Sequence, residues 1–394
     1  MEVATGLTRR RLLSGAAFAA GATLTSAPHI LRASEQAIDA LDSRSGKIVR
    51  ATIGIDTHNH IDVPLTAPEM PGPDIDLAGE MKQSGLSAIC MTFATDYQQG
   101  DAYDRFHNAL ASIDKQLQRN GMKRSLTAAD VRGAHARQHP TVIQAIEGAH
   151  FLQGHLERVA EAYEHGLRHF GLLHDSDASV PLGDVYTNGP RYGGLTDFGA
   201  RVIRECNRLG MLIDLAHADT QATGMALKIT TRPVVVSHTG LNTQLGSNPR
   251  IAQMMMPRLI SREQAKMIAG AGGAVGVWTH LSDTPLEYAR NIRALVDVIG
   301  VDHVMIGTDT KLTPPSPRPP GPPPNGFAGA GPRPSGPGPQ PPRIGERTNM
   351  AWPEEKDGFY FVVVDAMLKT GFTQDEIAKI GGGNYLRIFE QSMK

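Results

Sequence analysis

The sequence predicts an α/β fold in which eight parallel strands and their helices close into a TIM (β/α)8 barrel. Short apolar runs rich in β-branched residues alternate with amphipathic stretches, as in parallel strands joined by helices. We count eight such runs, the number that this barrel requires. Most of them stay apolar until their last positions and then end in a histidine or an acidic residue.

The expected strands and helices follow one another in order along the chain. The strands are expected at 51–61, 86–94, 141–148, 167–174, 209–217, 232–239, 272–280 and 302–310. Helical patterns with apolar residues three and four apart lie between them, for example at 104–119, 156–165, 198–209, 262–269 and 287–299. Two more, at 358–370 and 373–391, would complete the outer ring.

The N-terminal 33 residues are expected to be a twin-arginine signal peptide. Arg9 and Arg10 precede an apolar stretch of small residues, which is followed by Ser26-Ala27-Pro28. The alternative is a basic N-terminus followed by a short hydrophobic helix. The pattern predicts export by the twin-arginine machinery to the periplasm or the exterior, with residues 34–394 forming a single barrel domain. Because this machinery carries folded proteins, a metal could be loaded before export.

A low-complexity segment follows the last expected strand. Proline and glycine dominate residues 313–343, a composition that cannot build a core and favours polyproline-like or disordered chain. Its position places it at the C-terminal mouth of the barrel. A lid and an inert insertion are both open interpretations.

Composition limits the partners that the chain is expected to have. The formal net charge is −1 and the pI is about 7.0, so nothing indicates a nucleic acid or an anionic membrane. The two cysteines, Cys90 and Cys206, lie in apolar or helical patterns and are expected to be buried thiols. A small-molecule substrate fits this composition, and a homodimer is left open.

Six of the eight expected strands end in residues that suit metal binding or acid–base chemistry. In a TIM barrel these ends all face one mouth, where barrel enzymes carry their active sites. One such histidine alone would have an ordinary structural explanation, but six strands agree. The residues are His58 and His60, Glu147, His174, His217, His238 and Asp309.

The spacing and types of these residues predict a site for two divalent metal ions. His58 and His60 are two residues apart on a strand, so their side chains leave the same face. Glu147 follows an apolar run, and its two oxygens could bridge a pair of ions about 3.5–4 Å apart. His217 and His238 would complete the shell of the second ion. Imidazole is a common ligand of zinc.

Two further strand-end residues are expected to take part in catalysis. Asp309 can accept a proton from an activated water and deliver it to a leaving amine. His174 could polarise the substrate carbonyl or stabilise the oxyanion, or it could simply hydrogen-bond to a neighbouring loop.

Four blocks of sequence resemble the membrane dipeptidase (renal dipeptidase) family, peptidase family M19, a branch of the amidohydrolase-like metal barrels. They are Ile146-Glu147-Gly148-Ala149-His150, the stretch from 194 to 217, Ser237-His238-Thr239 and the ending at 383–389. The resemblance runs from about residue 55 to residue 389.

The resemblance implies a dipeptidase with two zinc ions. Glu147 would bridge the ions, His58 and the residue two later would hold one, and His217 and His238 the other. It also implies that His174 contacts the substrate, that Asp309 carries the proton, and that an arginine after His238 binds the substrate carboxylate. Asn248-Pro249-Arg250 resembles that arginine motif, which makes Arg250 the candidate. A solvated surface arginine is the alternative.

The chain departs from the family at the first metal position. The family usually has His-x-Asp there, whereas this chain has His58-Asn59-His60. A second acid usually follows the position of Asp309, where this chain has Thr310-Lys311. Losing one anionic ligand would either make the metal pair more Lewis acidic, favouring an anionic substrate, or weaken the first position.

Three functions are compatible with these residues. The leading one is hydrolysis of a dipeptide or a similar small amide. The second keeps the site but acts on a lactone or an N-acyl amino acid. The third is an exported binding protein that has lost turnover through the exchange at His60.

Overall fold

The computed structural model describes residues 43–394 except 71, 97–99, 313–346 and 353–356. The predicted signal peptide at 1–33 and the predicted insertion at 313–343 therefore lie outside the described residues. No helix among the described residues is long and apolar enough to cross a membrane.

The centre of the molecule is a parallel sheet in the order β8-β7-β6-β5-β4-β3-β2-β1-β9. The strands are β1 (Ile55–His60), β2 (Ala88–Ala94), β3 (Thr141–Glu147), β4 (Leu167–Gly171), β5 (Leu212–Asp214), β6 (Val235–Thr239), β7 (Ala274–Val277), β8 (Val304–Ile306) and β9 (Thr310–Lys311).

One stretch of chain joins the two ends of this sheet. β8 pairs with β7, and β9, which begins only four residues after β8 ends, pairs with β1. Between the two segments, the amide of Asp309 donates to the carbonyl of His58 at 3.1 Å. The last strand therefore closes the sheet on itself, and the predicted TIM barrel is confirmed.

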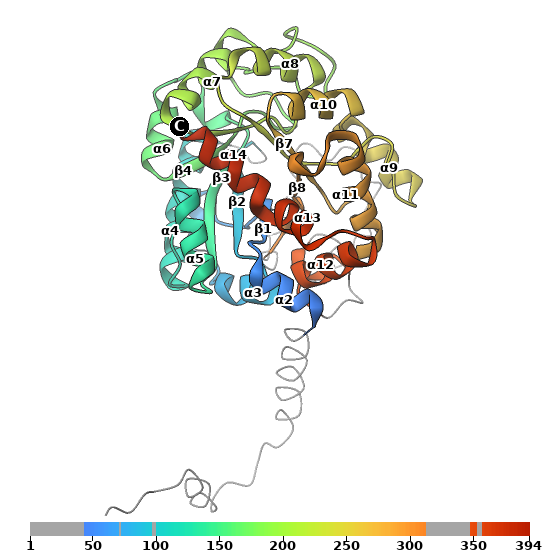
Figure 1. Ribbon diagram of the computed structural model, residues 1–394. Helices are drawn as coiled ribbons and strands as arrows, with labels where there is room; N and C mark the ends of the chain where they lie inside the picture. The colour runs from blue at the N-terminus through green and yellow to red at the C-terminus, as the bar shows by residue number, and fades with distance from the viewer. Residues whose placement is uncertain (1–42, 71, 97–99, 313–346, 353–356) are drawn as a thin grey trace, which may run out of the picture.

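Helices surround the strands in a ring (Figure 1). They are α2 (Arg44–Ala51), α3 (Leu77–Ser84), α4 (Ala102–Arg119), α5 (Ala128–Ala136), α6 (Arg158–Glu164), α7 (Asp197–Leu209), α8 (Thr220–Ile229), α9 (Pro249–Met255), α10 (Arg262–Gly270), α11 (Pro285–Ile299), α12 (Phe359–Lys369), α13 (Gln374–Ala378) and α14 (Asn384–Ser392). The helix predicted at 373–391 is divided into α13 and α14 by a π-helical turn at Lys379–Gly383. Glycine is required in this turn, because a Cβ on Gly381 would lie 2.1 Å from the hydroxyl of Tyr360.

The amino end of the barrel is closed by an apolar plug. Its members come from the first positions of the strands and from α14, which crosses the barrel in Figure 1. They include Ile55, Ala88, Leu212, Val235, Ala274, Tyr385, Leu386 and Phe389, each exposed by 3% or less. A second, larger apolar cluster fills the layer between the sheet and the outer helices. The polar strand ends are therefore left at the opposite mouth.

Candidate metal centre and active site

Glu147 lies at the centre of the barrel mouth. It is the last residue of β3, and only 4% of it is exposed. Five imidazoles direct Nε2 toward its carboxylate. Three face Oε1, namely His217 at 2.9 Å, His58 at 3.4 Å and His238 at 3.6 Å. Two face Oε2, namely His174 at 3.2 Å and His60 at 3.5 Å.

Two pairs of imidazole nitrogens have the spacing expected of ligands on one ion. The Nε2 atoms of His58 and His60 are 3.1 Å apart, and those of His217 and His238 are also 3.1 Å apart. Two nitrogens bound tetrahedrally to one zinc ion at their usual bond length lie about 3.4 Å apart. With Glu147 between the pairs, the donor set fits two divalent ions.

β1 is irregular where its first histidine lies. Its pairing with β2 shifts register between Asp56 and Asn59. Thr57, just before the histidines, donates across the barrel interior to the carbonyl of Ser237 at 2.7 Å. His58, the next residue, also reaches Ser237, with its Nδ1 3.3 Å from the hydroxyl oxygen, so two consecutive side chains of β1 face the barrel interior.

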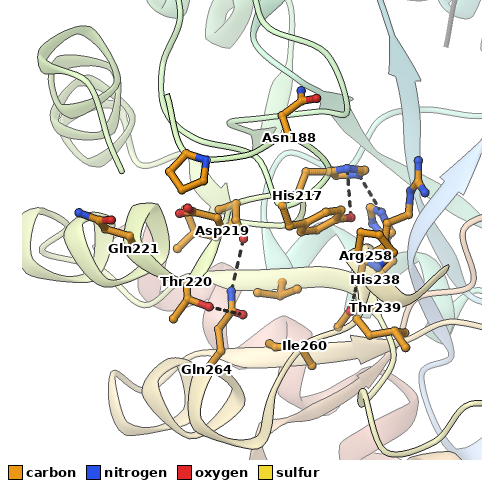
Figure 2. Close-up of a pocket in the computed structure, with 17 residues that line it drawn as sticks. Asn188, His217, Asp219, Thr220, Gln221, His238, Thr239, Arg258, Ile260 and Gln264 are labelled. Carbon is orange, nitrogen blue, oxygen red and sulfur yellow. Dashed lines mark hydrogen bonds between the residues drawn. The ribbon is translucent and has the colours of Figure 1, made fainter. Parts of the chain in front are cut away.

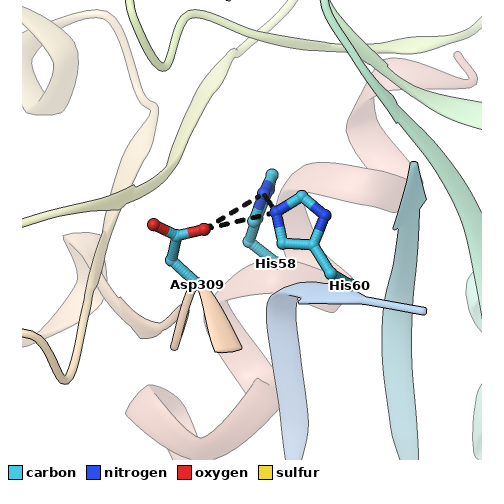
Figure 3. Close-up of side chains that lie close together, drawn as sticks. All are labelled: His58, His60 and Asp309. Carbon is cyan, nitrogen blue, oxygen red and sulfur yellow. Dashed lines mark hydrogen bonds and ion pairs between the residues drawn. The ribbon is translucent and has the colours of Figure 1, made fainter. Parts of the chain in front are cut away.

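Asp309 lies beside the first pair of histidines (Figure 3). Its Oδ1 is 3.3 Å from Nε2 of His60 and 3.8 Å from Nε2 of His58, and its Oδ2 is 2.8 Å from Nε2 of His280. Asp309 and His217 both have positive φ angles, 56° and 69°. A positive φ is uncommon for non-glycine residues, although Asp and His adopt it more often than most others, and residues held in this conformation cluster at functional sites.

The second ring nitrogens of His174 and His217 face carboxylates. Nδ1 of His174 is 2.9 Å from both oxygens of Asp96, whose side chain is 2% exposed. Nδ1 of His217 is 3.0 Å from Oδ1 of Asp175. Such partners fix the orientation of an imidazole and leave Nε2 directed at the site, as is usual around protein-bound metals.

Ser237 has the same role for the other two deeply buried histidines. Its hydroxyl oxygen is 2.9 Å from Nδ1 of His238 and 3.3 Å from Nδ1 of His58. Burial, reinforced by the positive charge of His58, lowers the pKa of His238 to about 3. His238 therefore stays neutral and is suited to metal binding.

The carboxylates of the mouth are held in their charged form. Burial alone would raise the pKa of Glu147, but the charges of His174 and His58 and the hydrogen bonds of the cluster hold it well below its usual range. Burial likewise acts on Asp96, but the charge and hydrogen bond of His174 lower its pKa to about 2. Asp175 and Asp309 also have lowered pKa values, against burial, because of neighbouring histidines. Because these carboxylates are buried and negatively charged, they are stabilised by cations bound among the imidazoles.

His217 and His238, although adjacent, have pKa values shifted in opposite directions. Burial lowers the pKa of His217, yet its hydrogen bonds to Asp175 and Glu147 raise the pKa to about 10. His217 thus carries a positive charge while its neighbour His238 is neutral. A metal ion on this pair would replace that proton and supply the positive charge that Glu147 requires.

A cavity of about 420 Å³ opens beside the second histidine pair (Figure 2). His217 and His238 form part of its wall, together with Tyr186 and Arg258. The guanidinium of Arg258 pairs with Oδ2 of Asp175, and the hydroxyl of Tyr186 is 3.1 Å from Nδ1 of His217. The rest of the wall is mixed: it includes the apolar residues Leu215, Val236, Pro257, Leu259 and Ile260 and the polar residues Asn188, Asp219, Thr220, Gln221, Thr239 and Gln264. The cavity can hold a small group next to these two candidate metal ligands.

Seven of the eight residues predicted for the site come together at the mouth. They are His58, His60, Glu147, His174, His217, His238 and Asp309. The eighth, Arg250, is exposed on α9 and does not line the cavity, which is lined instead by Arg258. The sequence offered a signal for Arg258, because Pro257-Arg258 repeats the dipeptide Pro249-Arg250 eight residues later.

Sequence reasoning missed four polar residues that contact the site, namely Asp96, Asp175, Ser237 and His280. His280 ends the seventh predicted strand and Asp96 lies two residues beyond β2, so the strand-end pattern applied to both. Asp175 follows His174 directly and Ser237 precedes His238. Their orientation toward the ring nitrogens depends on loop geometry that the sequence pattern does not give.

A closed TIM barrel with histidines and a carboxylate gathered at its mouth defines the class of amidohydrolase-like barrels. Residues 43–317 match the sequence model of the membrane dipeptidase family, peptidase family M19. The chain belongs to this family, and the resemblance seen in the sequence is confirmed.

Curated relatives share parts of the sequence. Dipeptidase 3 of Mus musculus is 25% identical over 274 residues, which is 68% of this chain and 47% of the mouse protein. Dipeptidase verJ of Clonostachys rogersoniana is 28% identical over 171 residues, 42% of this chain and 41% of the fungal protein. The matches thus span about half the length of these relatives or less.

Solved structures share the fold over most of the chain. An amidohydrolase from Pseudomonas aeruginosa gives a TM-score of 0.67 at 20% identity, covering 89% of this chain and 99% of that one. A metallopeptidase from Rhodobacter sphaeroides, liganded with a phosphinate mimic of the dipeptide L-Ala-D-Ala, gives a TM-score of 0.60 at 20% identity. The match covers 86% of this chain and 99% of that one.

Proposed function

We propose that this chain is a metal-dependent dipeptidase that hydrolyses a dipeptide or a similar small amide. The observation that carries the proposal is the carboxylate of Glu147 with five imidazole Nε2 atoms converging on it, beside a cavity that contains an arginine. The family supports it, and relatives named dipeptidase agree with it.

The residues of the mouth would hold two divalent ions, for which zinc suits the ligands best. His58 and His60 would hold one ion, and His217 and His238 would hold the other. Glu147 would contribute to both sites. When bound, such ions polarise a carbonyl group and lower the pKa of water toward neutrality.

Three side chains are placed to act on the substrate and its protons. Asp309 accepts the proton of the attacking water on Oδ1, while His280 holds Oδ2, and then delivers that proton to the leaving amine. His174 directs Nε2 into the site and is held by Asp96, so it can donate a hydrogen bond to the carbonyl oxygen as negative charge develops there.

Arg258 is placed to bind the carboxylate of the substrate. Its guanidinium lines the cavity next to His217 and His238, and charge-assisted pairs of arginine with carboxylate are strong and oriented. The apolar part of the wall, which includes Leu215, Val236 and Ile260, would contact the side chain of the C-terminal substrate residue.

His60, which replaces the family's usual aspartate, affects the first metal position. Asp309, 3.3 Å from His60, keeps a negative charge beside this position. We propose that the first position is therefore occupied, with a metal pair more Lewis acidic than one that has an additional carboxylate ligand. Metal content of the native protein and of His60→Asp tests this, and identical stoichiometry and activity in both would remove the proposed effect.

The function is tested by a hydrolysis panel on zinc-reconstituted protein with Asp309→Asn as the control. Dipeptides should be cleaved, and the variant should lose most of the activity. Cleavage of lactones or N-acyl amino acids in place of dipeptides would change the substrate class. Substrate binding without turnover would favour a binding protein.

We also propose export by the twin-arginine machinery, on the sequence pattern of residues 1–33 alone. Replacing Arg9 and Arg10 by lysine in the full chain should keep the protein in the cytoplasm. An unchanged distribution between cell fractions would contradict this.

A further inference from the structure

A second group of metal-competent side chains lies on the outer helices, apart from the barrel mouth. It consists of His107 on α4, and Glu161 and His165 at the end of α6. We propose that these three residues form a peripheral site for a transition-metal ion such as Zn²⁺, which links α4 to α6. The site is independent of the proposed dipeptidase activity.

The two helices bring the three donors together. Glu161 and His165 are four residues apart, so they lie on the same face at the C-terminal end of α6, where His165 is the capping residue. His107 reaches them from α4, and its Nε2 is 3.1 Å from Oε1 of Glu161. α4 and α6 lie on the same side of the ring in Figure 1.

The distances suit one ion with small side-chain adjustments. One donor atom from each residue can be chosen so that all three lie within 4.8 Å of one another. The rings of His107 and His165 have centroids 5.7 Å apart and an interplanar angle of 81°. Ligands of a tetrahedral zinc ion lie about 3.4 Å apart, so the donors need to close by only a fraction of that distance.

A neighbouring tyrosine orients the carboxylate of this site. The hydroxyl of Tyr103 lies 2.8 Å and 2.7 Å from the two oxygens of Glu161, to which it donates. Metal-binding carboxylates commonly have such a hydrogen-bonded partner. Arg158 lies over the ring of Tyr103, but its NH1 donates to the backbone oxygens of Phe151 and Leu152. Its guanidinium is thus held by partners outside the group.

The identity of the donors limits the ion. Two imidazoles and one carboxylate favour Zn²⁺, Ni²⁺ or Cu²⁺, whereas Mg²⁺ and Ca²⁺ favour oxygen ligands. Three protein ligands leave a fourth position for water. The competing explanation is a simple ion pair between His107 and Glu161, which has no use for His165. Substitution of His165 therefore distinguishes the two.

The test is equilibrium dialysis of the full chain against Zn²⁺, comparing the wild type with His165→Ala and Glu161→Gln. His155→Ala is the matched control, because His155 forms an exposed pair with Glu157 at 3.0 Å in the segment leading into α6. The wild type and the control should bind about one zinc ion per chain more than the two test variants. Zinc should also raise the Tm less in the test variants, since one stabilising site is lost.

Hydrolytic activity should be the same in all four proteins, so a failure of the proposed dipeptidase function would not affect this result. Equal zinc stoichiometry and equal zinc-dependent Tm in the wild type, His165→Ala and Glu161→Gln would overturn the peripheral site. Loss of the zinc ion in Glu161→Gln but not in His165→Ala would also overturn it as a three-ligand site.

Discussion

The two ends of the barrel are built from the same strands but from opposite kinds of side chain. At the amino end, residues such as Ile55, Leu212 and Val235 pack against Tyr385 and Phe389 of α14, with no more than 3% of any of them exposed. At the carboxyl end, the same strands place histidines and carboxylates within about 4 Å of one another. From this difference we expect the apolar amino end to contribute more to folding stability than the charged mouth, which supplies the proposed chemistry.

A polar layer separates the two ends. Oδ1 of Asp214 accepts from the amides of Ser237 at 2.9 Å and Ala216 at 3.0 Å, and its Oδ2 is 3.2 Å from Nε2 of His169. His169 in turn lies 3.1 Å, Nδ1 to hydroxyl, from Tyr385 in the plug. The layer connects the plug to β6, which carries the proposed metal ligand His238.

The largest expected effect is at the centre of the mouth. Glu147→Gln keeps the shape of the side chain but removes the charge shared by both metal positions, so we expect kcat/KM to fall about 10³-fold or more. Metal analysis should show loss of bound ions, while the unfolding transition stays cooperative. Glu164→Gln, on the exposed face of α6, is the control. Retention of both metal and activity in Glu147→Gln would contradict its bridging role.

The plug should show the opposite behaviour. Phe389→Ala removes a fully buried ring and should cost about 3–5 kcal/mol of unfolding free energy, because a cavity is left in the apolar layer. Denaturant unfolding measures this loss. The kcat of the protein that remains folded should stay near that of the wild type. A large fall in kcat with unchanged stability would show that the two ends are not separable in this way.

Asp96 should affect turnover more than binding. Asp96→Asn weakens the partner that orients His174, so we expect kcat to fall about 10- to 100-fold with little change in KM. Metal content should not change, because His174 is assigned to the substrate. Asp177→Asn, on the loop after His174, is the matched control. Loss of a metal ion in Asp96→Asn would mean that His174 is a ligand.

The smallest expected effect distinguishes two arginines. Arg258→Lys keeps the charge but loses the two-pronged geometry, so KM for a dipeptide should rise about tenfold, or ~1.4 kcal/mol. Arg250→Lys should leave KM unchanged, because Arg250 is exposed on α9 and does not line the cavity. The reverse result would indicate that Arg250 binds the substrate carboxylate, as the sequence motif predicted.

The sequence was informative about the barrel because strand runs and helical periodicity are local properties. It also predicted most residues of the mouth, since a barrel of parallel strands brings the carboxyl ends of its strands together irrespective of the loop conformations. Arg258 could not be placed, because two identical Pro-Arg dipeptides lie eight residues apart, one at the start of α9 and one just after it, and only the folded chain shows which arginine lines the cavity. The orientation of Asp96 and Asp175 toward the ring nitrogens depends on loop conformations that carry no periodic signal.

The central claim is that the mouth holds two metal ions around Glu147. Anomalous X-ray scattering from crystals of zinc-loaded protein, recorded at the zinc absorption edge, tests it most directly. The account predicts two peaks on either side of the Glu147 carboxylate, one beside His58 and His60 and the other beside His217 and His238. A mouth without anomalous peaks, with the imidazoles paired only to carboxylates and water, would contradict it.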